Sequence, residues 1–271
     1  MKQEIRLILS DLDGTLLPSD KIMTEYTKKM IHKLKEKGYL FGIASGRPLP
    51  PLKEKMRRWQ MDTCIDVWIG NNGTEYEDSD GYFLQENFLS IEDAQEIYQR
   101  VKDLPVSCGV FDDERKALRV SCLNSSIEKV ASNNYYSYSI EDMKMVLKEK
   151  EYPKVFVTET PEKMDAVEKK LKEIEGEDFY GVRSGGLMFE FISRKASKSK
   201  GIARVCEHRK LKMENIMVMG DGDNDIEMLK DAGVAVVMAN GSASAKAVAD
   251  LLAGNNDEEG WGRFIESYFQ L

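Results

Sequence analysis

The chain has few of the residues on which several common kinds of active site depend. Its 271 residues include only two histidines, His32 and His208, and each lies in a stretch rich in lysine and arginine that is typical of an exposed helix. A histidine-based catalytic triad and a multi-histidine metal site are therefore disfavoured. We expect the chemistry of this protein to depend on carboxylates, lysine, serine and asparagine.

Cysteine is also scarce, and its spacing does not suit a metal or redox site. The four cysteines are widely separated and form no Cys-x-x-Cys pair, which argues against a zinc site or a redox dithiol. Buried free thiols are the ordinary alternative. The four are Cys64, Cys108, Cys122 and Cys206.

Long apolar runs and an excess of positive charge are missing as well. No stretch approaches the ~20 apolar residues that span a bilayer, and Asp11 and Asp13 interrupt the first apolar run too early for a signal peptide. The net charge of −8 disfavours nucleic acid and anionic membranes as partners. We therefore expect a cytoplasmic protein.

A pair of aspartates at the end of a predicted strand is the strongest positive signal. The short, branched apolar run 5–9 is typical of a buried strand, and residues 10–17 read Ser-Asp-Leu-Asp-Gly-Thr-Leu-Leu. Because a strand sends alternate residues to the same side, Asp11 and Asp13 can face one spot. Two anions so close repel each other unless a cation or a proton intervenes. A hard divalent cation such as Mg²⁺ suits these oxygen ligands.

The order of the predicted elements indicates an α/β fold. Strands and helices alternate at both ends of the chain, which predicts right-handed crossovers and a doubly wound, Rossmann-like parallel sheet. The predicted strands after the first are 40–44, 66–69, 216–219 and 234–238, and the predicted helices are 24–37, 197–209 and a stretch ending at 232.

The middle of the chain breaks this alternation and predicts a second domain. Between about 83 and 186 the segments suggest an inserted α+β module, so the core domain would be discontinuous and comprise 1–82 and 187–271. The helices predicted in this region are 90–103, 140–150 and 161–175, and the extended segments are 106–111, 118–122, 154–158, 179–183 and 187–192.

Polar side chains occur in four loops that the predicted topology brings to one edge of the core sheet. Each signal has an ordinary alternative: an isolated serine often caps a helix, a lone lysine is usually exposed, and the acidic run 220–225 lacks the layout of an EF-hand. Ligands bind at the carboxyl edge of such sheets, so the four loops together predict one site. They contribute Asp11 and Asp13, then Ser45, then Lys200, and finally Asp221, Asn224 and Asp225.

The order and spacing of these motifs resemble the haloacid dehalogenase-like (HAD) hydrolase superfamily over the whole chain. The long insert and several short motifs are similar to the Cof-type sugar phosphatases, which carry a type IIB α+β cap. Residues 237–241 depart from that group, because Ala239 and Gly241 stand where Gly and Ala are common. The matching segments are Asp11-Leu12-Asp13-Gly14-Thr15, Ala44-Ser45-Gly46-Arg47, Asn72-Gly73, Ser199-Lys200-Gly201, Gly220-Asp221-x-x-Asn224-Asp225 and the tail 255–260.

The resemblance implies a role for each of these residues. Asp11 would be the nucleophile that forms an aspartyl-phosphate, and Asp13 the general acid and base. Residues 83–186 would form a mobile lid that selects the substrate, hinged near 82–84 and 185–186. The further implied roles are Mg²⁺ binding by Asp11, the Asp13 carbonyl and Asp221; phosphate binding by Ser45, Gly46, Lys200 and Asn224; support by Asp225; and substrate contact by Arg47 and Arg183.

Three functions are compatible with this pattern. The first is a Mg²⁺-dependent phosphatase for a small phosphorylated metabolite, with sugar phosphates as the expected class. The second is a phosphotransferase or mutase on the same scaffold, which needs the same aspartates. The third is a silent phosphoester sensor, which would be expected to have lost a motif position, and every motif position is present.

Overall fold

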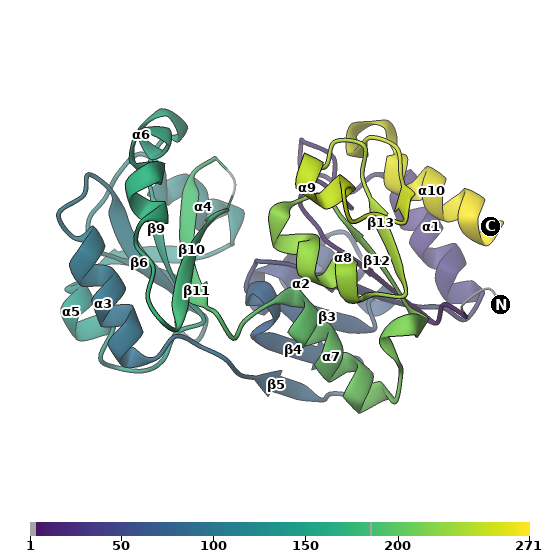
Figure 1. The fold of residues 1–271 in the computed structure, drawn as a ribbon, viewed down its shortest axis with the longest axis horizontal. Helices are drawn as coiled ribbons and strands as arrows, with labels where there is room; N and C mark the ends of the chain where they lie inside the picture. The colour runs from purple at the N-terminus through teal and green to yellow at the C-terminus, as the bar shows by residue number, and fades with distance from the viewer. Residues whose placement is uncertain (1–3, 185) are drawn as a thin grey trace. The chain divides into compact units, whose positions relative to one another are not determined.

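A computed structural model describes residues 4–184 and 186–271, and these residues form two compact units (Figure 1). The first unit contains the described residues up to Leu49 together with Lys55–Gln85 and Ser197–Leu271. The second contains Pro50–Glu54 and the described residues of Glu86–Ala196. One of the two expected hinges falls on Gly185, which lies outside the described residues.

The first unit is built on an eight-stranded sheet in the order β14-β13-β12-β1-β2-β3-β4-β5. All neighbours from β14 to β3 are parallel, whereas β4 and β5 add an antiparallel hairpin at one edge. The predicted α/β fold with a doubly wound parallel sheet is confirmed. The strands are β1 (Leu7–Ser10), β2 (Leu40–Ala44), β3 (Val67–Gly70), β4 (Glu75–Asp78), β5 (Phe83–Gln85), β12 (Ile216–Gly220), β13 (Val234–Val237) and β14 (Leu251–Leu252).

Helices cover both faces of this sheet, which explains why its central strands read as continuous apolar runs. On one face, Ile202 of α7 and Met228 of α8 join the buried cluster that contains Leu7 of β1. On the other, α1 and α10 lie side by side, and Phe41 packs edge-on against Trp261 at 5.6 Å. The helices are α1 (Glu25–Glu36), α2 (Leu49–Arg58), α7 (Lys198–Arg209), α8 (Ile226–Asp231), α9 (Ala243–Lys246) and α10 (Gly260–Phe269).

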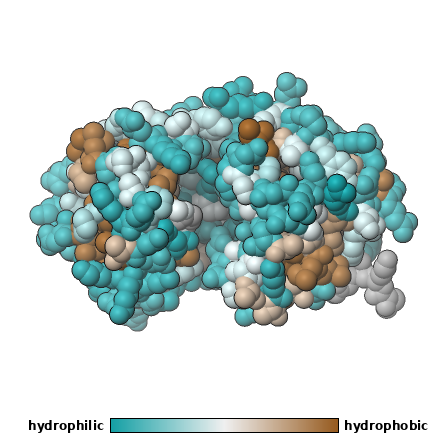
Figure 2. Space-filling model, turned by 90° about the horizontal axis from the view of Figure 1, so that it is seen from above, coloured by the Kyte–Doolittle hydropathy of each residue, from teal (hydrophilic) through white to brown (hydrophobic). Residues whose placement is uncertain are grey.

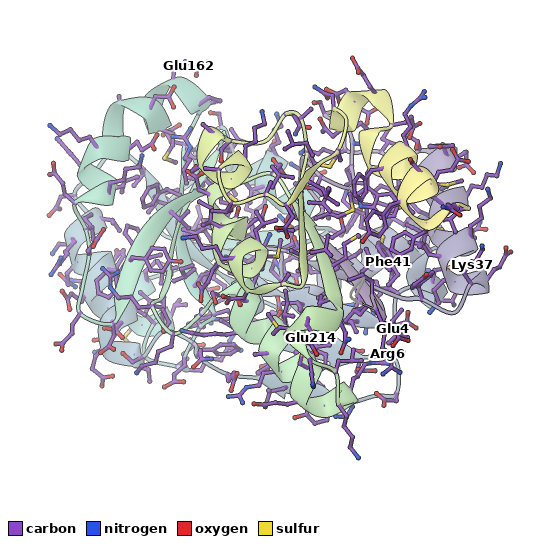
Figure 3. The ribbon with its side chains drawn as sticks, turned by 45° about the vertical axis from the view of Figure 1, so that its right-hand side comes forward. Glu4, Arg6, Lys37, Phe41, Glu162 and Glu214 are labelled. Atoms are coloured by element: carbon purple, nitrogen blue, oxygen red, sulfur yellow. The ribbon has the colours of Figure 1, made fainter. Side chains whose placement is uncertain are left out.

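Because the central strands are parallel, all their amino ends lie at one end of the sheet and all their carboxyl ends at the other. Glu4 and Arg6 precede β1, Glu214 precedes β12, and the three side chains lie at the same end of the sheet (Figure 3). The Arg6 N–H donates to the Asn215 carbonyl at 2.9 Å there. The carboxyl ends of β1, β2 and β12 consequently meet at the opposite end of the sheet, where three of the four predicted polar loops emerge. The remaining one, with Lys200, instead belongs to the start of α7, which follows a strand of the second unit.

The second unit is a six-stranded sheet in the order β10-β11-β9-β6-β7-β8, mostly antiparallel and covered by short helices. Its main apolar cluster unites α3, α5 and α6 with the sheet. The bounds are α3 (Ile91–Val101), β6 (Ser107–Asp112), β7 (Ala117–Val120), α4 (Ile127–Asn133), β8 (Ser137–Ile140), α5 (Met143–Val146), β9 (Lys154–Thr158), α6 (Pro161–Lys172), β10 (Phe179–Ser184) and β11 (Met188–Ser193).

Strand pairing places both domain boundaries at residues other than those expected from the sequence. β5 pairs with β4, so the first unit extends to Gln85 rather than to residue 82. β11 lies between β9 and β10, so the second unit continues to Ala196 rather than to residue 186.

The helix expected at 140–150 is also replaced, because Ile140 pairs with Val120 in the sheet and Asp142 caps the short α5 that follows.

Among the described residues, no helix combines the length and the apolar character needed to cross a bilayer. On the face drawn in Figure 2, hydrophobic side chains interrupt a mostly hydrophilic surface only in separate patches.

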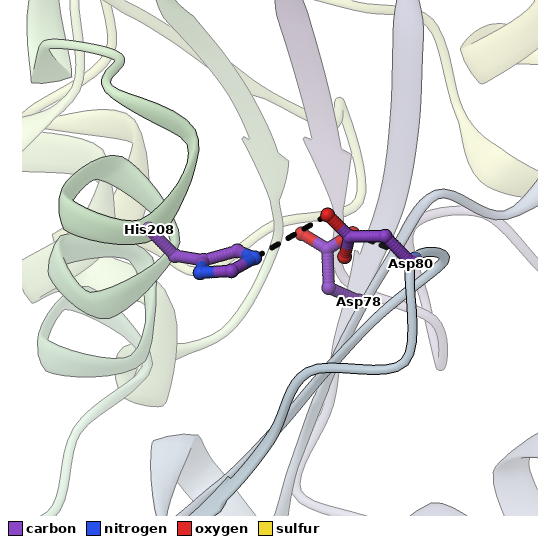
Figure 4. A group of neighbouring side chains, drawn as sticks. All are labelled: Asp78, Asp80 and His208. Atoms are coloured by element: carbon purple, nitrogen blue, oxygen red, sulfur yellow. Dashed lines mark hydrogen bonds and ion pairs between the residues drawn. The ribbon is translucent and has the colours of Figure 1, made fainter.

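The β4–β5 hairpin is fastened to the last turn of α7 by buried polar contacts. Arg209 donates to both carboxylate oxygens of Asp78, one of which also accepts the Tyr76 hydroxyl at 2.6 Å. The His208 ring stacks on Tyr82 with centroids 4.1 Å apart. His208 Nε2 lies 3.5 Å from Asp80 (Figure 4). Both Asp78 oxygens are engaged by protein donors, so this group is an anchor for the hairpin rather than a metal centre.

Replacing the buried carboxylate of this anchor should destabilise the protein. Asp78→Asn leaves Arg209 without its ionic partner, which we expect to cost about 3–5 kcal/mol of unfolding free energy at pH 7. Although burial opposes it, hydrogen bonds from Arg209 and Tyr76 hold the pKa of Asp78 well below its usual range. The stabilisation is thus complete above the unfolded pKa near 4 and is lost as the pH falls below it.

Urea denaturation of Asp78→Asn and wild type at pH 7 and pH 3 tests this, and the gap between them should shrink at pH 3. The exposed neighbour provides the control, because Asp80→Asn should cost under about 1 kcal/mol. Equal losses of unfolding free energy in the two variants would contradict the role of Asp78 as the anchor of the hairpin.

Candidate active site

Asp11 occupies the point where β1 ends and is held between two strands. Its backbone N–H donates to the Met219 carbonyl of β12 at 2.8 Å, and its own carbonyl accepts the Leu16 N–H at 3.3 Å. Only 7% of the residue is exposed. Gly14 turns the chain immediately afterwards with φ +100°, a left-handed value that favours glycine. Strand and turn together fix a buried carboxylate at the edge of the sheet.

A buried lysine joins this carboxylate to the fourth loop. Lys198 Nζ lies 2.5 Å from Asp11 Oδ1 and 2.6 Å from Asp225 Oδ1. The other Asp225 oxygen accepts the backbone N–H groups of Asp221 and Gly222 at 3.0 and 2.9 Å. Asp225 thus contacts both Lys198 and the backbone of its own loop.

The lysine expected at this position was Lys200, and the structure corrects it to Lys198. Lys200 is exposed, and its backbone N–H donates to the Ser197 side chain that caps α7. Residues two apart on a helix point in different directions, so only one of the two lysines can face the site. Lys198 shares the buried face of α7 with Ile202 and Val205, a periodicity already present in the sequence.

Three carboxylates meet beside the lysine and create a suitable place for a cation. Oxygens of Asp11, Asp221 and Asp225 lie within 4.8 Å of one another. Burial, reinforced by the charges of Asp225 and Asp221, raises the pKa of Asp11 to about 8 despite the Lys198 ammonium. Burial also raises the pKa of Asp221, which accepts the Thr15 hydroxyl at 2.6 Å. A divalent cation would relieve this repulsion, and the all-oxygen donor set fits a hard ion.

Asp13 lies in a different electrostatic setting. Arg47 donates to both of its carboxylate oxygens, from Nε at 2.7 Å and from Nη2 at 3.1 Å, and Lys21 Nζ lies 3.4 Å away. Although burial opposes it, these two cations lower the pKa of Asp13 to about 2. Arg47, expected as a substrate contact, is thus a partner of Asp13 in this structure.

Ser45 and Gly46 emerge from β2 beside the loop that follows β3. The Ser45 N–H donates to the Ile69 carbonyl at 2.9 Å, and its carbonyl accepts the Asn72 N–H at 3.1 Å. A Cβ added at Gly46 would lie 3.1 Å from Asn72 Oδ1. The loop after β3 therefore packs closely against the predicted phosphate-binding segment.

The two remaining predicted contacts differ in their surroundings. Asn224 is exposed in the 3₁₀ turn Asp223–Asp225, directly before the residue that holds Lys198. Arg183 belongs to the second unit, where its guanidinium donates to Asp165 and Glu168 of α6 at 3.1 and 3.0 Å.

Several supporting residues were not predicted from the sequence. Asn240 Nδ2 donates to the Gly14 carbonyl at 2.8 Å, and Asn240 Oδ1 accepts the Asn256 N–H at 3.0 Å. The Asp221 carbonyl accepts the Ser242 N–H at 2.8 Å. The segment that departs from the Cof-type pattern at Ala239 and Gly241 hence retains a turn that supports the site. Thr15, Lys21 and Lys198 complete the set of unpredicted residues.

The family comparison agrees with this geometry. Residues 8–265 match the haloacid dehalogenase-like hydrolase family. Among curated proteins, the 5-amino-6-(5-phospho-D-ribitylamino)uracil phosphatase YitU of Bacillus subtilis is 26% identical over 278 residues, covering 100% of both chains.

Solved structures agree in fold over nearly the whole chain. A haloacid dehalogenase-like hydrolase from Bacteroides thetaiotaomicron superposes with a TM-score of 0.84 at 25% identity, covering 98% of this chain and 100% of the other. The HAD subclass IIB sugar phosphatase BT4131 gives a TM-score of 0.81 at 21% identity with the same coverage, which supports the predicted type IIB architecture at the level of the fold.

The close approach of Gly14 to Asp221 predicts a site-specific effect of one added methyl group. A Cβ at Gly14 would lie 2.5 Å from Asp221 Oδ2, so Gly14→Ala must displace that carboxylate. We expect Mg²⁺ affinity, measured by titration calorimetry, to fall by about tenfold or more.

Gly38→Ala is the matched control, because Gly38 has φ +84° and nothing within 4 Å of the added Cβ. Both variants should lose about 1–2 kcal/mol of stability from the left-handed backbone. Equal Mg²⁺ affinities in the two variants would contradict the metal site.

Proposed function

Because the chain belongs to the haloacid dehalogenase-like hydrolase family, we propose that it is a Mg²⁺-dependent cytoplasmic phosphatase of small phosphorylated metabolites, with sugar phosphates as the substrate class. The carrying observation is the buried triad of Asp11, Lys198 and Asp225 beside Asp221. The B. subtilis relative is named for a phosphorylated sugar-alcohol derivative, which supports the same class of substrate.

Asp11 is the nucleophile in this proposal. One carboxylate oxygen faces Lys198, and attack on phosphorus by the carboxylate breaks the ester P–O bond and forms an aspartyl-phosphate. Water then attacks the same phosphorus, which releases inorganic phosphate and regenerates Asp11. This route divides one difficult displacement into two easier ones. Its first step brings the anionic carboxylate close to an anionic substrate, and the Lys198 ammonium reduces the repulsion between the two anions.

The phosphoryl oxygens need donors that do not have to reorganise during the reaction. Ser45 and the Gly46 N–H are held by the braced loop after β2, and Lys198 by Asp225. Such fixed donors stabilise charge as it develops in the transition state. Asn224, exposed at the fourth loop, supplies a further amide donor.

Asp13 exchanges protons with the leaving group and with water. Arg47 and Lys21 keep it ionised but weaken it as a base, so it accepts the proton of the attacking water after Arg47 has moved away. Its other task, protonation of the leaving alkoxide, requires that Arg47 turn from Asp13 to the substrate. In this way Arg47 regains the role of substrate contact.

The metal-binding residues in this proposal are Asp11, the backbone carbonyl of Asp13, and Asp221. Bound there, Mg²⁺ supplies positive charge that offsets the phosphoryl oxygens. Thr15 orients Asp221 through its hydroxyl, and Asp225 fixes the backbone of the same loop.

The inserted second unit is the lid in this proposal and selects the substrate. A lid can exclude water while Asp11 attacks and admit one molecule for the second step. Arg183 is retained as a candidate substrate contact, although in this structure it pairs with acidic residues of α6.

Removal of the nucleophile should abolish turnover while the fold is retained. Asp11→Asn should lower kcat for an aryl phosphate in the presence of Mg²⁺ by at least about 10³-fold, because the amide cannot form the covalent intermediate. Phosphate release and circular dichroism measure the two properties. The exposed Asp103→Asn is the control for loss of one acidic charge. Near-normal activity of Asp11→Asn would refute the assignment.

The two lysines at the start of α7 should behave differently. Lys198→Met should reduce kcat by about 10²–10³-fold, the usual effect of losing one donor to a transition-state anion. Lys200→Met removes the same charge two residues away and should change kcat less than about threefold. Steady-state kinetics with a common aryl phosphate compares the pair. A larger loss of kcat for Lys200→Met than for Lys198→Met would instead support Lys200 as the phosphate-binding lysine.

A further inference from the structure

The phosphoryl-transfer chemistry described above uses Lys21 and Arg47 through their contacts with Asp13, but it gives no role to Lys55. These three cations adjoin Asp13 as one cluster. We refer to it as the cation cluster. Arg47 and Lys21 contact the Asp13 carboxylate directly. Lys55 Nζ lies 3.5 Å from the Lys21 carbonyl. All four residues belong to the first unit.

The three cations of the cluster differ in their contacts with carboxylates. Asp13 is a single carboxylate shared by Arg47 and Lys21. Lys55 has no carboxylate partner among the described residues, and its ammonium instead lies 4.8 Å from the centroid of the Trp59 ring. A ring face and a carbonyl oxygen stabilise a cation less than a carboxylate or phosphate does.

Local structure explains why Lys55 stays in this position. Lys55 and Trp59 are four residues apart at the end of α2, so their side chains lie on the same face of the helix. Lys21 has a left-handed backbone conformation with φ +62°, and this bend sets the directions of its carbonyl and its side chain. The cluster is thus set by backbone geometry and by packing on the indole.

The electrostatic state of Lys55 agrees with this geometry. Burial, followed by the charge of Arg47, lowers the pKa of Lys55, and Lys21 acts in the same direction. Asp13 offsets only part of the effect. An additional anion beside Lys55 would relieve the repulsion among the three cations.

The charges with the largest effect on Asp11 differ from those with the largest effect on Lys55, although Lys21 also acts to lower the pKa of Asp221. The groups that influence Asp11 are Lys198, Asp225 and Asp221. Those that influence Lys55 are Arg47, Asp13 and Lys21. Asp13, which faces the leaving group in the proposed reaction, is the link between the two sets.

We propose that Lys55, with Lys21, binds a second anionic group on the leaving-group side of the substrate, so that preferred substrates are phosphomonoesters with an additional phosphate or carboxylate. This inference rests on the proposed phosphatase function and narrows its substrate class. A sugar bisphosphate and a phosphorylated sugar acid both provide the required chemistry.

Matched substrates test the proposal. Glucose 1,6-bisphosphate is compared with glucose 6-phosphate, and 6-phosphogluconate with glucitol 6-phosphate, so that each pair differs by one anionic group. For wild type, kcat/KM should be about tenfold higher for at least one two-anion substrate than for its partner. The two pairs distinguish a phosphate from a carboxylate as the preferred second group.

Substitution of Lys55 should remove this preference. Lys55→Met should reduce the ratio of kcat/KM within the preferred pair about tenfold, and Lys55→Arg should restore most of it. Lys29→Met, an exposed lysine on α1, is the matched control for the change in net charge and should leave the ratio unchanged. Thermal unfolding of each variant checks that the fold is intact.

Binding measurements separate this inference from the proposed function. Calorimetric titration of glucose 1,6-bisphosphate and 6-phosphogluconate into Asp11→Asn, with and without Lys55→Met, needs no turnover. Loss of affinity for either compound by about tenfold in the double variant supports the cluster even if no substrate is hydrolysed. The proposal would be overturned if the affinity for neither compound depended on Lys55. It would also be overturned if Lys55→Met lowered kcat/KM equally for the two members of each substrate pair.

Discussion

The contact of one buried ammonium with two buried carboxylates is the constraint around which the site is organised. Lys198 is 1% exposed and lies within 2.6 Å of both Asp11 and Asp225. Breaking a buried pair of this kind leaves an uncompensated charge and is strongly unfavourable. The start of α7, the end of β1 and the loop after β12 must therefore keep their relative positions, and this edge of the sheet is rigid for an electrostatic reason.

α7 extends this constraint to a second buried ion pair. The helix has 12 residues, so its ends are about 16 Å apart. Lys198 begins it beside Asp11, and Arg209 ends it on Asp78 of the β4–β5 hairpin. The chain leaves the first unit directly after this hairpin and returns directly before α7. In sequence, the two ends of the inserted segment thus adjoin elements that α7 joins within the first unit.

The charges at the site fall into two groups with different tasks. Around Asp11 the carboxylates exceed the single lysine, which favours a cation. Beside Asp13, Arg47 and Lys21 share its carboxylate, whereas Lys55 faces a ring and a carbonyl oxygen, which favours an anion. A phosphate ester placed between them would meet metal and Lys198 at its phosphorus and positive charge on its leaving-group side. This asymmetry is the physical basis of the proposed catalysis and of the proposed substrate class.

The sequence alone determined the α/β class, the parallel character of the core sheet and the loops that bear Asp11, Ser45 and Asp221, because short apolar runs followed by polar residues encode strand ends locally. It did not determine which lysine enters the site, because the spacing of Lys198 from Ile202 and Val205 defines one face of α7 but does not show that this face meets Asp11. Nor did it reveal the β4–β5 hairpin or the true ends of the insert, which depend on pairing between distant strands. The cation cluster likewise required tertiary structure, because Lys21, Arg47 and Lys55 come from three segments that only the folded chain brings together.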